Sequence, residues 1–347
     1  MPTARKWVSD SLTVLTVVLF WWAILECSLR FLQGPIHDEF LNQSYNLQHP
    51  TTHRVFGPHP VLGKWNLPNA EGLQQRMEYR TRIKINSKGL RGPEKEYGKP
   101  QDKKRILFLG DSFTFGTGVE QDESFVWRIQ KLADPKLDII NGGAPGSSTN
   151  EEFRFLSSEG FRYAPDGVVL VFFQNDIQDN YGDALEASGA AKRRNPATLF
   201  YKALAKASGI LEERLYGRSA VYAAVSYWKR NFLESYQVSK KEFAVTHRQL
   251  EKIRGFCAAN GYPLALVYLP RREELKKTGN GLGSEWLADY CGKNNLPLLN
   301  LWEKFRARKD TKLLYFQFDT HLTPYGHEVT AQLILDFFRA VGILPAA

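Results

Sequence analysis

Residues 105–347 of this sequence predict an α/β fold, in which helices cover both faces of a parallel sheet. Short apolar runs recur there that suit buried strands, and segments of helical periodicity separate them. The last of these helical segments opens with a proline, which favours a helix start. The expected strands are residues 105–109, 137–140, 167–173, 263–269 and 296–299. The expected helices are residues 123–132, 150–158, 243–260, 284–293 and about 324–341.

The N-terminal segment is strongly apolar. Residues 12–25 (LTVLTVVLFWWAIL) form a run of about 14 residues, shorter than the ~20 that span a bilayer. Residues 8–32 are long enough to span a bilayer. Asp10 and Arg30 can be accommodated in this segment because they lie near its ends, where long side chains reach the headgroups. Glu26 lies somewhat further inside. We therefore predict one transmembrane anchor at residues 8–32.

A cleaved signal peptide and a buried core helix are the alternatives for this segment. No small-residue cleavage site of the A-x-A type follows Leu25. A core helix would begin unusually close to the terminus. Arg5 and Lys6 precede the apolar run, so the positive-inside rule predicts a cytoplasmic N-terminus. The rest of the chain would then be extracytoplasmic, which means periplasmic in a Gram-negative cell.

Two segments depart from the α/β rhythm. Residues 33–104 are rich in Pro, Gly, Asn and His, and we expect an irregular connecting region with a few short strands, one of them near residues 79–85. Residues 179–239 contain aromatic and basic residues but no clear strand. We interpret them as a helical insertion that could cover a site.

Composition narrows the class of partner. The formal net charge is +9, but the positive residues are scattered in small groups with no basic helix and no interleaved aromatics. This pattern favours a solvated surface over nucleic-acid binding, and it leaves attraction to an anionic surface open. Three cysteines, Cys27, Cys257 and Cys291, are too few for a disulfide framework. Pairing of Cys257 with Cys291 would require an exported domain.

The first candidate site segment is Gly110-Asp111-Ser112-Phe113, directly after the strand at 105–109. A sharp turn at a strand end can present a serine hydroxyl. The nearby glycines do not form G-x-G-x-x-G, and no Gly-Lys-Ser/Thr follows, so neither a dinucleotide fingerprint nor a P-loop is indicated. Gly-Asp-Ser by itself is weak evidence for a catalytic serine, since this tripeptide also occurs in ordinary turns.

Three further segments carry residue types that suit catalysis. In residues 141–149 (NGGAPGSST), glycines let backbone N–H groups face a ligand. Gln174-Asn175-Asp176 follows a predicted strand, and its amide could donate to an oxyanion. In residues 319–323 (DTHLT), His321 could act as a base with Asp319 holding its tautomer. The alternative interpretation of these three segments is that they are ordinary turns and that His321 is a surface histidine at a helix start.

Together and in this order, these segments resemble the Ser, Gly, Asn and His blocks of the SGNH/GDSL hydrolase family. The matching text is GDSFTFGTG, NGGAPGSST, FQND and DTHLTPYGH, and the resemblance covers residues 105–341 without the 179–239 insertion. It implies a flavodoxin-like three-layer sandwich with a parallel sheet, and no cofactor or metal. The implied catalytic residues are Ser112, Asp319 and His321, with Ser112, Gly146 and Asn175 forming the oxyanion hole. Residues 86–94 (NSKGLRGPE) and the anchor resemble a membrane-anchored bacterial subgroup related to polysaccharide O-acetylation proteins.

One departure concerns the acid of the triad. The family usually places Asp three residues before the histidine, where this chain has Phe318, whereas Asp319 is two before. Asp176 is the next acid to consider. Other histidines suggest little: His49, His53 and His59 lack the neighbours of a metal site, and His327 could lie near the site or simply be exposed.

The resemblance implies a serine-dependent hydrolase of acyl esters, for which acetyl esters of carbohydrate are the expected class. A carbohydrate O-acyltransferase is the alternative, because the same triad can pass the acyl group to a sugar hydroxyl instead of water. A non-catalytic binding or assembly protein on this fold is a third possibility, against which the intact Ser112, Asn175 and His321 argue. The expected partners are an acyl-ester substrate, which could belong to a polysaccharide, and the membrane.

Overall fold

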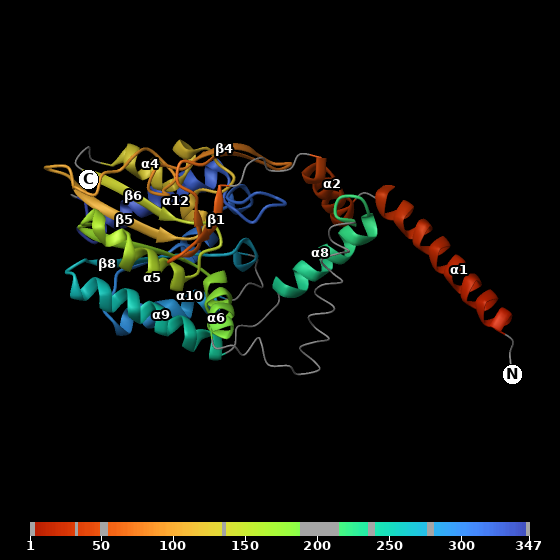
Figure 1. Cartoon of the computed structure of the whole chain (residues 1–347). Helices are drawn as coiled ribbons and strands as arrows, with labels where there is room; N and C mark the ends of the chain where they lie inside the picture. The colour runs from red at the N-terminus through yellow and green to blue at the C-terminus, as the bar shows by residue number, and fades with distance from the viewer. Residues whose placement is uncertain are drawn as a thin grey trace. The chain divides into compact units, whose positions relative to one another are not determined.

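The computed structural model describes residues 4–31, 34–48, 55–133, 137–187, 215–234, 240–275 and 281–344 (Figure 1). The chain divides into two compact units. The smaller unit comprises Met1–Pro50 and Arg193–Tyr236, and the larger comprises Thr51–Lys192 and Gln237–Ala347.

The larger unit is built on a five-stranded sheet whose neighbouring strands are all parallel. Its order is β6-β5-β7-β8-β9, with β5 at Lys104–Gly110, β6 at Leu137–Gly143, β7 at Gly167–Phe173, β8 at Leu264–Leu269 and β9 at Leu298–Asn300. The strands β5 to β8 contain few exposed residues, as expected of strands covered on both faces. The predicted α/β fold with a parallel sheet is confirmed.

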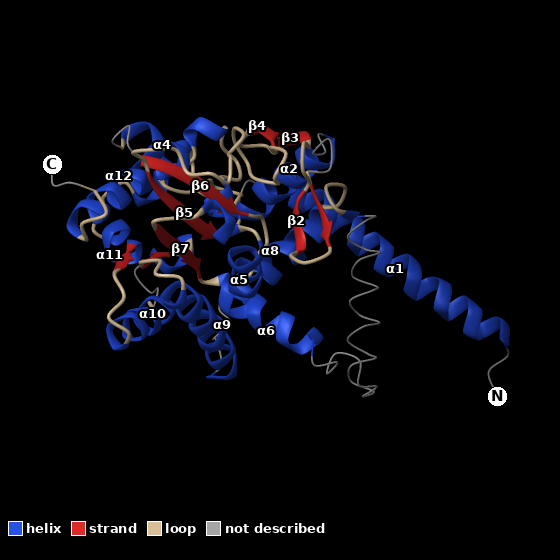
Figure 2. Ribbon diagram, turned by 60° about the vertical axis from the view of Figure 1, so that its left-hand side comes forward, coloured by secondary structure: helices blue, strands red, loops and turns tan. Residues whose placement is uncertain are grey.

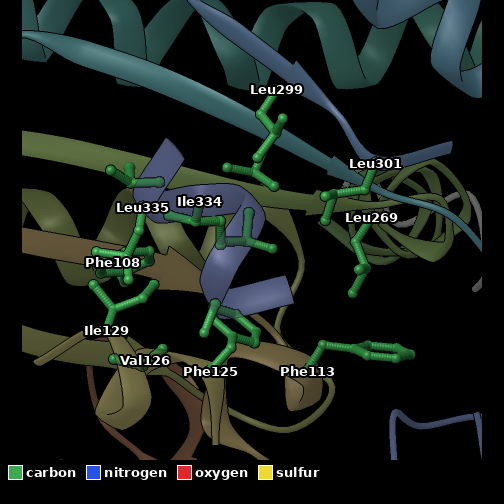
Figure 3. Close-up of a cluster of buried hydrophobic side chains, with 14 of the residues drawn as sticks. Phe108, Phe113, Phe125, Val126, Ile129, Leu269, Leu299, Leu301, Ile334 and Leu335 are labelled. Atoms are coloured by element: carbon green, nitrogen blue, oxygen red, sulfur yellow. The ribbon is translucent and has the colours of Figure 1, made fainter. Parts of the chain in front are cut away.

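Two layers of helices enclose this sheet (Figure 2). On one face lie α4 (Phe125–Leu132), α11 (Leu301–Arg306) and α12 (Pro324–Ala340), and on the other lie α5 (Thr149–Ser158), α9 (Lys240–Ala259) and α10 (Leu282–Lys293). Residues alternate along each strand between the two cores: Phe108 of β5 joins the first, whereas Leu107 and Leu109 join the second. Figure 3 shows part of the first core, including Phe125 and Ile334.

Smaller elements complete this unit. Two antiparallel pairs precede the sheet, β1 (Phe56–His59) with β2 (Gly63–Asn66) and β3 (Glu71–Gln75) with β4 (Arg80–Lys84). Short helices are α3 (Ser112–Phe115), η1 (Gln121–Glu123), η2 (Gly160–Tyr163), η4 (Arg272–Leu275) and η5 (Thr311–Leu313). Cys257 and Cys291 are free, buried thiols, so this structure contains no bond between them. Burial raises the pKa of each to about 12.

Two predictions of local structure were wrong, and one helix was not predicted. Residues expected to be irregular form α2 (Pro35–Gln48), a largely polar helix that packs on α8, so its apolar signal was weak. Asn175 and Asp176, which follow β7 and were read as turn residues at a strand end, instead begin α6 (Asn175–Ala187), and only Gln174 lies in a turn. The helix α11 was not foreseen, because its six residues are too few to show periodicity.

The smaller unit consists of α1 (Ala4–Phe31), α2 and α8 (Ala220–Glu234) among the described residues. Within α1, Thr13–Phe31 is long and apolar enough to cross a membrane, with a mean hydropathy of 1.7. The helix α8 is part of the segment predicted as an insertion, of which residues 188–214 and 235–239 lie outside the described residues.

Glu26 joins α1 to the start of α8 within the smaller unit. Its carboxylate accepts hydrogen bonds from the Ser219 hydroxyl at 2.7 Å and from the backbone N–H groups of Ala220 at 2.7 Å and Val221 at 3.1 Å. One helix therefore supplies the acceptor that the first N–H groups of another helix lack. Arg30 adds a bond of 2.5 Å to the carbonyl of Arg218.

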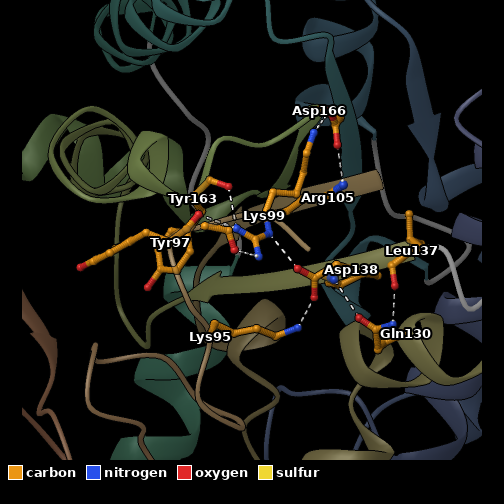
Figure 4. Close-up of polar contacts among 11 residues, drawn as sticks. Lys95, Tyr97, Lys99, Arg105, Gln130, Leu137, Asp138, Tyr163 and Asp166 are labelled. Carbon is orange, nitrogen blue, oxygen red and sulfur yellow. Dashed lines mark hydrogen bonds and ion pairs between the residues drawn. The ribbon is translucent and has the colours of Figure 1, made fainter. Parts of the chain in front are cut away.

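A buried cation secures the amino end of β5 (Figure 4). The side chain of Arg105, only 1% exposed, pairs with Asp138 at 2.7 Å. Its remaining donors reach the carbonyls of Tyr97 at 2.9 Å and Tyr163 at 2.8 Å. Lys95 is a second partner of Asp138. This network attaches the segment before β5 to both β6 and η2.

Replacement of Arg105 tests how much this network contributes. Arg105→Met should lower the free energy of unfolding by about 3 kcal/mol, because it leaves a buried carboxylate and several carbonyls with fewer partners. Denaturant unfolding of the full-length protein measures the change. Lys99→Met is the control: Lys99 and Asp166 form an ion pair with both side chains about a third exposed, and its loss should cost less than about 1 kcal/mol. Equal effects of the two variants would contradict this account.

Candidate active site

The candidate residues gather at the carboxyl ends of the strands. Counted along the chain, the five strands follow the order 2-1-3-4-5, which reverses direction beside β5 and β7. Ligands of such sheets bind in the crevice outside this reversal point. Ser112 follows β5 and Asn175 follows β7, so both lie at this place. Topology alone therefore brings together residues that are 63 positions apart in sequence, the difference between 175 and 112.

A tight turn presents Ser112. A Cβ on Gly110 would lie 2.1 Å from Thr114 Oγ1, so only glycine allows the strand to turn so closely into α3. The carboxylate of Asp111 accepts the N–H of Phe113 at 2.9 Å and caps this short helix. On the other side, a Cβ on Gly143 would lie 2.3 Å from the backbone nitrogen of Phe115. These contacts hold the Ser112 backbone against β6.

Arg91, from the motif at residues 86–94, supports the same turn. Its buried guanidinium donates to the carbonyls of Phe115 at 3.2 Å, Gly116 at 2.5 Å and Val119 at 2.7 Å. Phe115 ends α3 and Gly116 caps it, where helix geometry leaves carbonyl acceptors without partners. The motif thus stabilises the loop behind Ser112 rather than contacting its hydroxyl.

His321 approaches Ser112 from the loop before α12. Its Nε2 lies 2.7 Å from Ser112 Oγ, and its Nδ1 hydrogen-bonds the Asp319 carboxylate. A carboxylate can only accept, so Nδ1 carries the proton and Nε2 is free to accept the serine hydroxyl. The ring also packs on Phe113, with 4.9 Å between the ring centres.

The two-residue spacing from Asp319 to His321 works through a local turn. Asp319 Oδ1 accepts the backbone N–H of His321 at 3.0 Å and also faces its ring, an arrangement that Asp readily forms with the residue two positions on. Burial by itself would raise the pKa of Asp319, but hydrogen bonds and the charge of His321 lower it to about 2. Asp319 therefore carries a negative charge at neutral pH. Its other oxygen accepts the Tyr79 hydroxyl at 2.9 Å.

The proposed oxyanion donors lie at the same edge of the sheet. Asn175 opens α6, and its Nδ2 donates to Asp179 at 2.9 Å, which leaves one N–H of that amide for another acceptor. Gly146 is exposed with φ of +74°, and nothing lies within 4 Å of a Cβ placed there. The space beside its Cα is therefore open.

Three buried acids lie behind Ser112. Asp111, Glu152 and Asp176 are each at most 1% exposed. Burial raises the pKa of all three, and the neighbouring acids raise those of Glu152 and Asp176 further. Neither carboxyl oxygen of Glu152 has a hydrogen-bond partner among the described residues. Asp176 accepts from the N–H of Phe173 at 3.3 Å, and the acid beside His321 is Asp319.

Four other histidines were considered in the sequence: His49, His53, His59 and His327. His327 is fully buried, where its Nδ1 accepts the N–H of Phe125 at 3.1 Å, so the expectation that it could be exposed was wrong. Burial lowers its pKa to about 3. The Nδ1 of His59 accepts the N–H groups of Val61 and Leu62. His49 and His53 lie outside the described residues, and the part that is described contains no group of three potential metal ligands.

Sequence comparison identifies the family. The profile of the GDSL-like Lipase/Acylhydrolase family matches residues 108–329, more than half of the chain. The chain belongs to this family. The resemblance to SGNH/GDSL hydrolases is thus confirmed, while the membrane-anchored O-acetylation subgroup stays a prediction. A search of curated proteins found no match to this GDSL-family chain.

Several solved structures are similar to this GDSL-family protein. One is a lipase/acylhydrolase from Enterococcus faecalis, with 16% identity, a TM-score of 0.43, and coverage of 70% of this chain and 98% of that one. Another is the psychrotrophic esterase EstA from Pseudoalteromonas sp., with 14% identity, a TM-score of 0.43, and coverage of 69% and 98%. An acetyl xylan esterase, AlAXEase, matches at 14% identity and a TM-score of 0.43, over 67% and 98%.

The buried acids predict an unusual pH dependence of stability. Burial raises the pKa of Asp111 from 3.8 to about 6, so the folded protein binds more protons than the unfolded chain between these values. The free energy of unfolding should therefore decrease as pH rises from about 4 to about 6. Asp319, with its lowered pKa, acts in the opposite sense but only below about pH 4.

Glu152→Gln tests this dependence by removing one buried acid and keeping its shape. The variant should lose less stability between pH 4.5 and 7 than the wild type, because it has no carboxyl at this position to deprotonate. Melting temperatures measured across this pH range report the difference. Glu285→Gln, an exposed site on α10, is the matched control and should follow the wild type. Parallel curves for all three proteins would refute the claim that Glu152 is held protonated.

Proposed function

We propose that this protein hydrolyses acyl esters with Ser112 as the nucleophile. The observation that supports the proposal is the continuous set of hydrogen bonds from Ser112 Oγ through the His321 ring to the Asp319 carboxylate. A nucleophile, a base and a group that orients the base are the parts that such acyl transfer requires. Membership of the GDSL-like lipase/acylhydrolase family agrees with this chemistry.

The reaction would proceed in two halves. His321 Nε2 takes the proton of Ser112 as its oxygen bonds to the ester carbonyl carbon, and the carbonyl oxygen becomes negative. When the tetrahedral intermediate collapses, the alcohol leaves with the proton from His321, and an acyl-serine remains. Water then attacks the acyl-serine with His321 again as base, and the carboxylic acid is released. Asp319 stabilises the charged imidazole in both halves.

The oxyanion would be held by the N–H groups of Ser112 and Gly146 and by the side-chain amide of Asn175. The bond from Asn175 to Asp179 fixes the plane of the amide while one N–H stays available. A donor held in place before the reaction needs no reorganisation when negative charge develops. Loss of such a donor typically lowers turnover by 100-fold or more.

For the substrate, we propose short acyl esters, with acetyl groups on carbohydrate as the expected class. This part of the proposal rests on the resemblance of residues 86–94 and the anchor to proteins of polysaccharide O-acetylation. Incubation of the purified protein with a p-nitrophenyl acetate to octanoate series gives the acyl preference. Mass spectrometry of an added acetyl-free oligosaccharide then separates hydrolysis, which leaves it unchanged, from transfer, which adds acetyl groups.

The triad predicts a specific pattern of lost activity. Ser112→Ala and His321→Ala should each nearly abolish ester turnover, and the double variant should be little worse, because the two residues act as a unit. Asp319→Asn should lower kcat by roughly 10³- to 10⁴-fold. Asn175→Ala should lower it by about 100-fold.

The exposed residue between Asp319 and His321 provides the control. Thr320→Ala should retain wild-type turnover in the same assay, since no described contact of its side chain reaches the triad. Substantial turnover by Ser112→Ala would rule out the serine mechanism. A nearly silent Asp319→Asn would reduce the triad to a Ser-His pair.

For the N-terminal helix, we propose a retained membrane anchor rather than a cleaved signal. The supporting observation is the carboxylate of Glu26, which caps the start of α8 with three hydrogen bonds. Cleavage after α1 would leave these N–H groups without their acceptor, at a typical cost of about 1 kcal/mol. Arg5 and Lys6 before the helix support a cytoplasmic N-terminus.

Retention of the anchor is measurable on protein isolated from cells. Peptide mapping by mass spectrometry should recover residues 8–31 in the isolated protein, and alkaline carbonate should leave the protein in the membrane. A reporter that works only outside the cytoplasm should be active when fused after Ala347. A carbonate-soluble chain lacking residues 1–31 would contradict the anchor, and activity of only a cytoplasmic reporter would contradict the orientation.

A further inference from the structure

The hairpin turn between β3 and β4 reaches the proposed triad from a part of the chain that lies outside the family match at 108–329. Residues 76–79 form this turn, which is closed by hydrogen bonds between Arg76 and Tyr79. Two of its side chains contact the loop that carries Asp319. Neither side chain belongs to one of the four sequence blocks that resemble the family.

Tyr79 contacts the acid itself. Its hydroxyl donates to Asp319 Oδ2 at 2.9 Å, on the opposite side of the carboxylate from the oxygen that faces His321. Tyr79 is largely buried, and burial and the charge of Asp319 both raise its pKa, so the hydroxyl keeps its proton at physiological pH. Its ring lies 5.1 Å from that of Phe316, in a tilted arrangement.

Glu78 binds the backbone of the same loop. Its carboxylate accepts three consecutive N–H groups, those of Gln317 at 2.5 Å, Phe318 at 2.9 Å and Asp319 at 2.8 Å. Successive N–H groups that converge in this way form a concave binding site for an anion. Hydrogen bonds to a charged group are roughly twice as strong as neutral ones.

A second contact holds the loop from another element. Arg272, on η4, donates to the carbonyls of Phe316 at 2.8 Å and Gln317 at 2.6 Å. The backbone around residues 316–319 is therefore bound by two elements. Its N–H groups donate to Glu78 of the β3–β4 turn, and its carbonyls accept from Arg272 of η4. Such bonding on both sides restricts where the Asp319 side chain begins.

We propose that Glu78 and Tyr79 are positioning residues of the esterase site, which hold Asp319 so that it can orient His321. This inference rests on the proposed function of the triad. The short Asp-x-His spacing explains the need: one oxygen of Asp319 already serves both the backbone N–H and the ring of His321. The other oxygen needs a fixed donor if the carboxylate is to keep one orientation, and the hairpin turn supplies it.

The decisive experiment removes single atoms from this contact in the full-length protein. Tyr79→Phe should lower kcat for p-nitrophenyl acetate by about 10- to 100-fold, with KM within twofold of the wild type, because only the orientation of the acid changes. The rate of Ser112 labelling by a fluorophosphonate probe should fall in parallel. Glu78→Gln should have a similar effect, since an amide replaces an acceptor oxygen with a donor that faces N–H groups.

Two controls separate positioning from a general effect on folding. Tyr97→Phe removes a hydroxyl that also hydrogen-bonds a carboxylate, that of Glu159, and it should leave kcat unchanged. In an Asp319→Ala background, Tyr79→Phe should change kcat by less than twofold, because the group through which Tyr79 acts is gone. Melting temperatures show whether each variant is folded.

The possible outcomes distinguish a positioning role, a structural role and failure of the proposed function. Tyr79→Phe with wild-type kcat, or with the same fold loss in the presence and absence of Asp319, overturns the positioning role while the triad stands. A wild-type protein that neither turns over esters nor reacts with the probe at Ser112 overturns the proposed function and the positioning role together. A loss of kcat confined to variants that have also lost their thermal transition overturns the positioning role in favour of a structural one.

Discussion

The hydrogen bond of 2.7 Å between Ser112 and His321 connects residues that are 209 positions apart. It forms only if several elements of the larger unit hold both residues in place. Ser112 must emerge from β5 by a turn that only glycine at 110 permits. His321 must sit on a loop that ends at the N-cap of α12, where the Thr323 side chain accepts the N–H of Gly326. The sheet supplies the fixed reference for both, because β5 is paired on each side and α12 packs on its face.

Electrostatics around this bond are divided into two regions. On one side, Asp319 is stabilised as an anion by donors from His321 and Tyr79. On the other, Asp111, Glu152 and Asp176 lie in the interior, where burial favours their protonated forms. The negative charge of Asp319 lies beside the imidazole, where it supports a developing positive charge. Behind the serine, burial raises the pKa values of the three acids, which opposes the build-up of negative charge there.

The smaller unit relates to function in a different way. Glu26 is a carboxylate within the largely apolar stretch Thr13–Phe31 of α1, where an ionisable group is costly unless it has partners. The start of α8 provides those partners. The helix α8, part of the segment predicted as an insertion, is therefore attached to the proposed anchor by directional hydrogen bonds. This attachment gives the helix a structural role beyond that of a tether.

Much of the fold was readable from sequence because its signals are local. A strand buried on both faces must be apolar along its length, as residues 167–173 are, and a helix must repeat its apolar face every three to four residues. Weakly patterned elements escaped, as α2 shows, since packing on α8 rather than periodicity accounts for it. The interior position of His327 was equally unreadable, because a histidine at a helix start is usually exposed.

The sequence by itself determined the strand-helix alternation, the family, and the candidates Ser112, Asn175 and His321, because each of these depends on residues adjacent in the chain. Only the tertiary structure decided which acid faces His321, since Asp176 and Asp319 were both eligible until the fold buried one and turned the other toward the ring. It also decided the contacts of Glu78 and Tyr79, which lie about 240 positions from the loop that they bind. Contacts between residues so far apart in sequence depend on how the folded chain brings its loops together. No local sequence pattern predicts them.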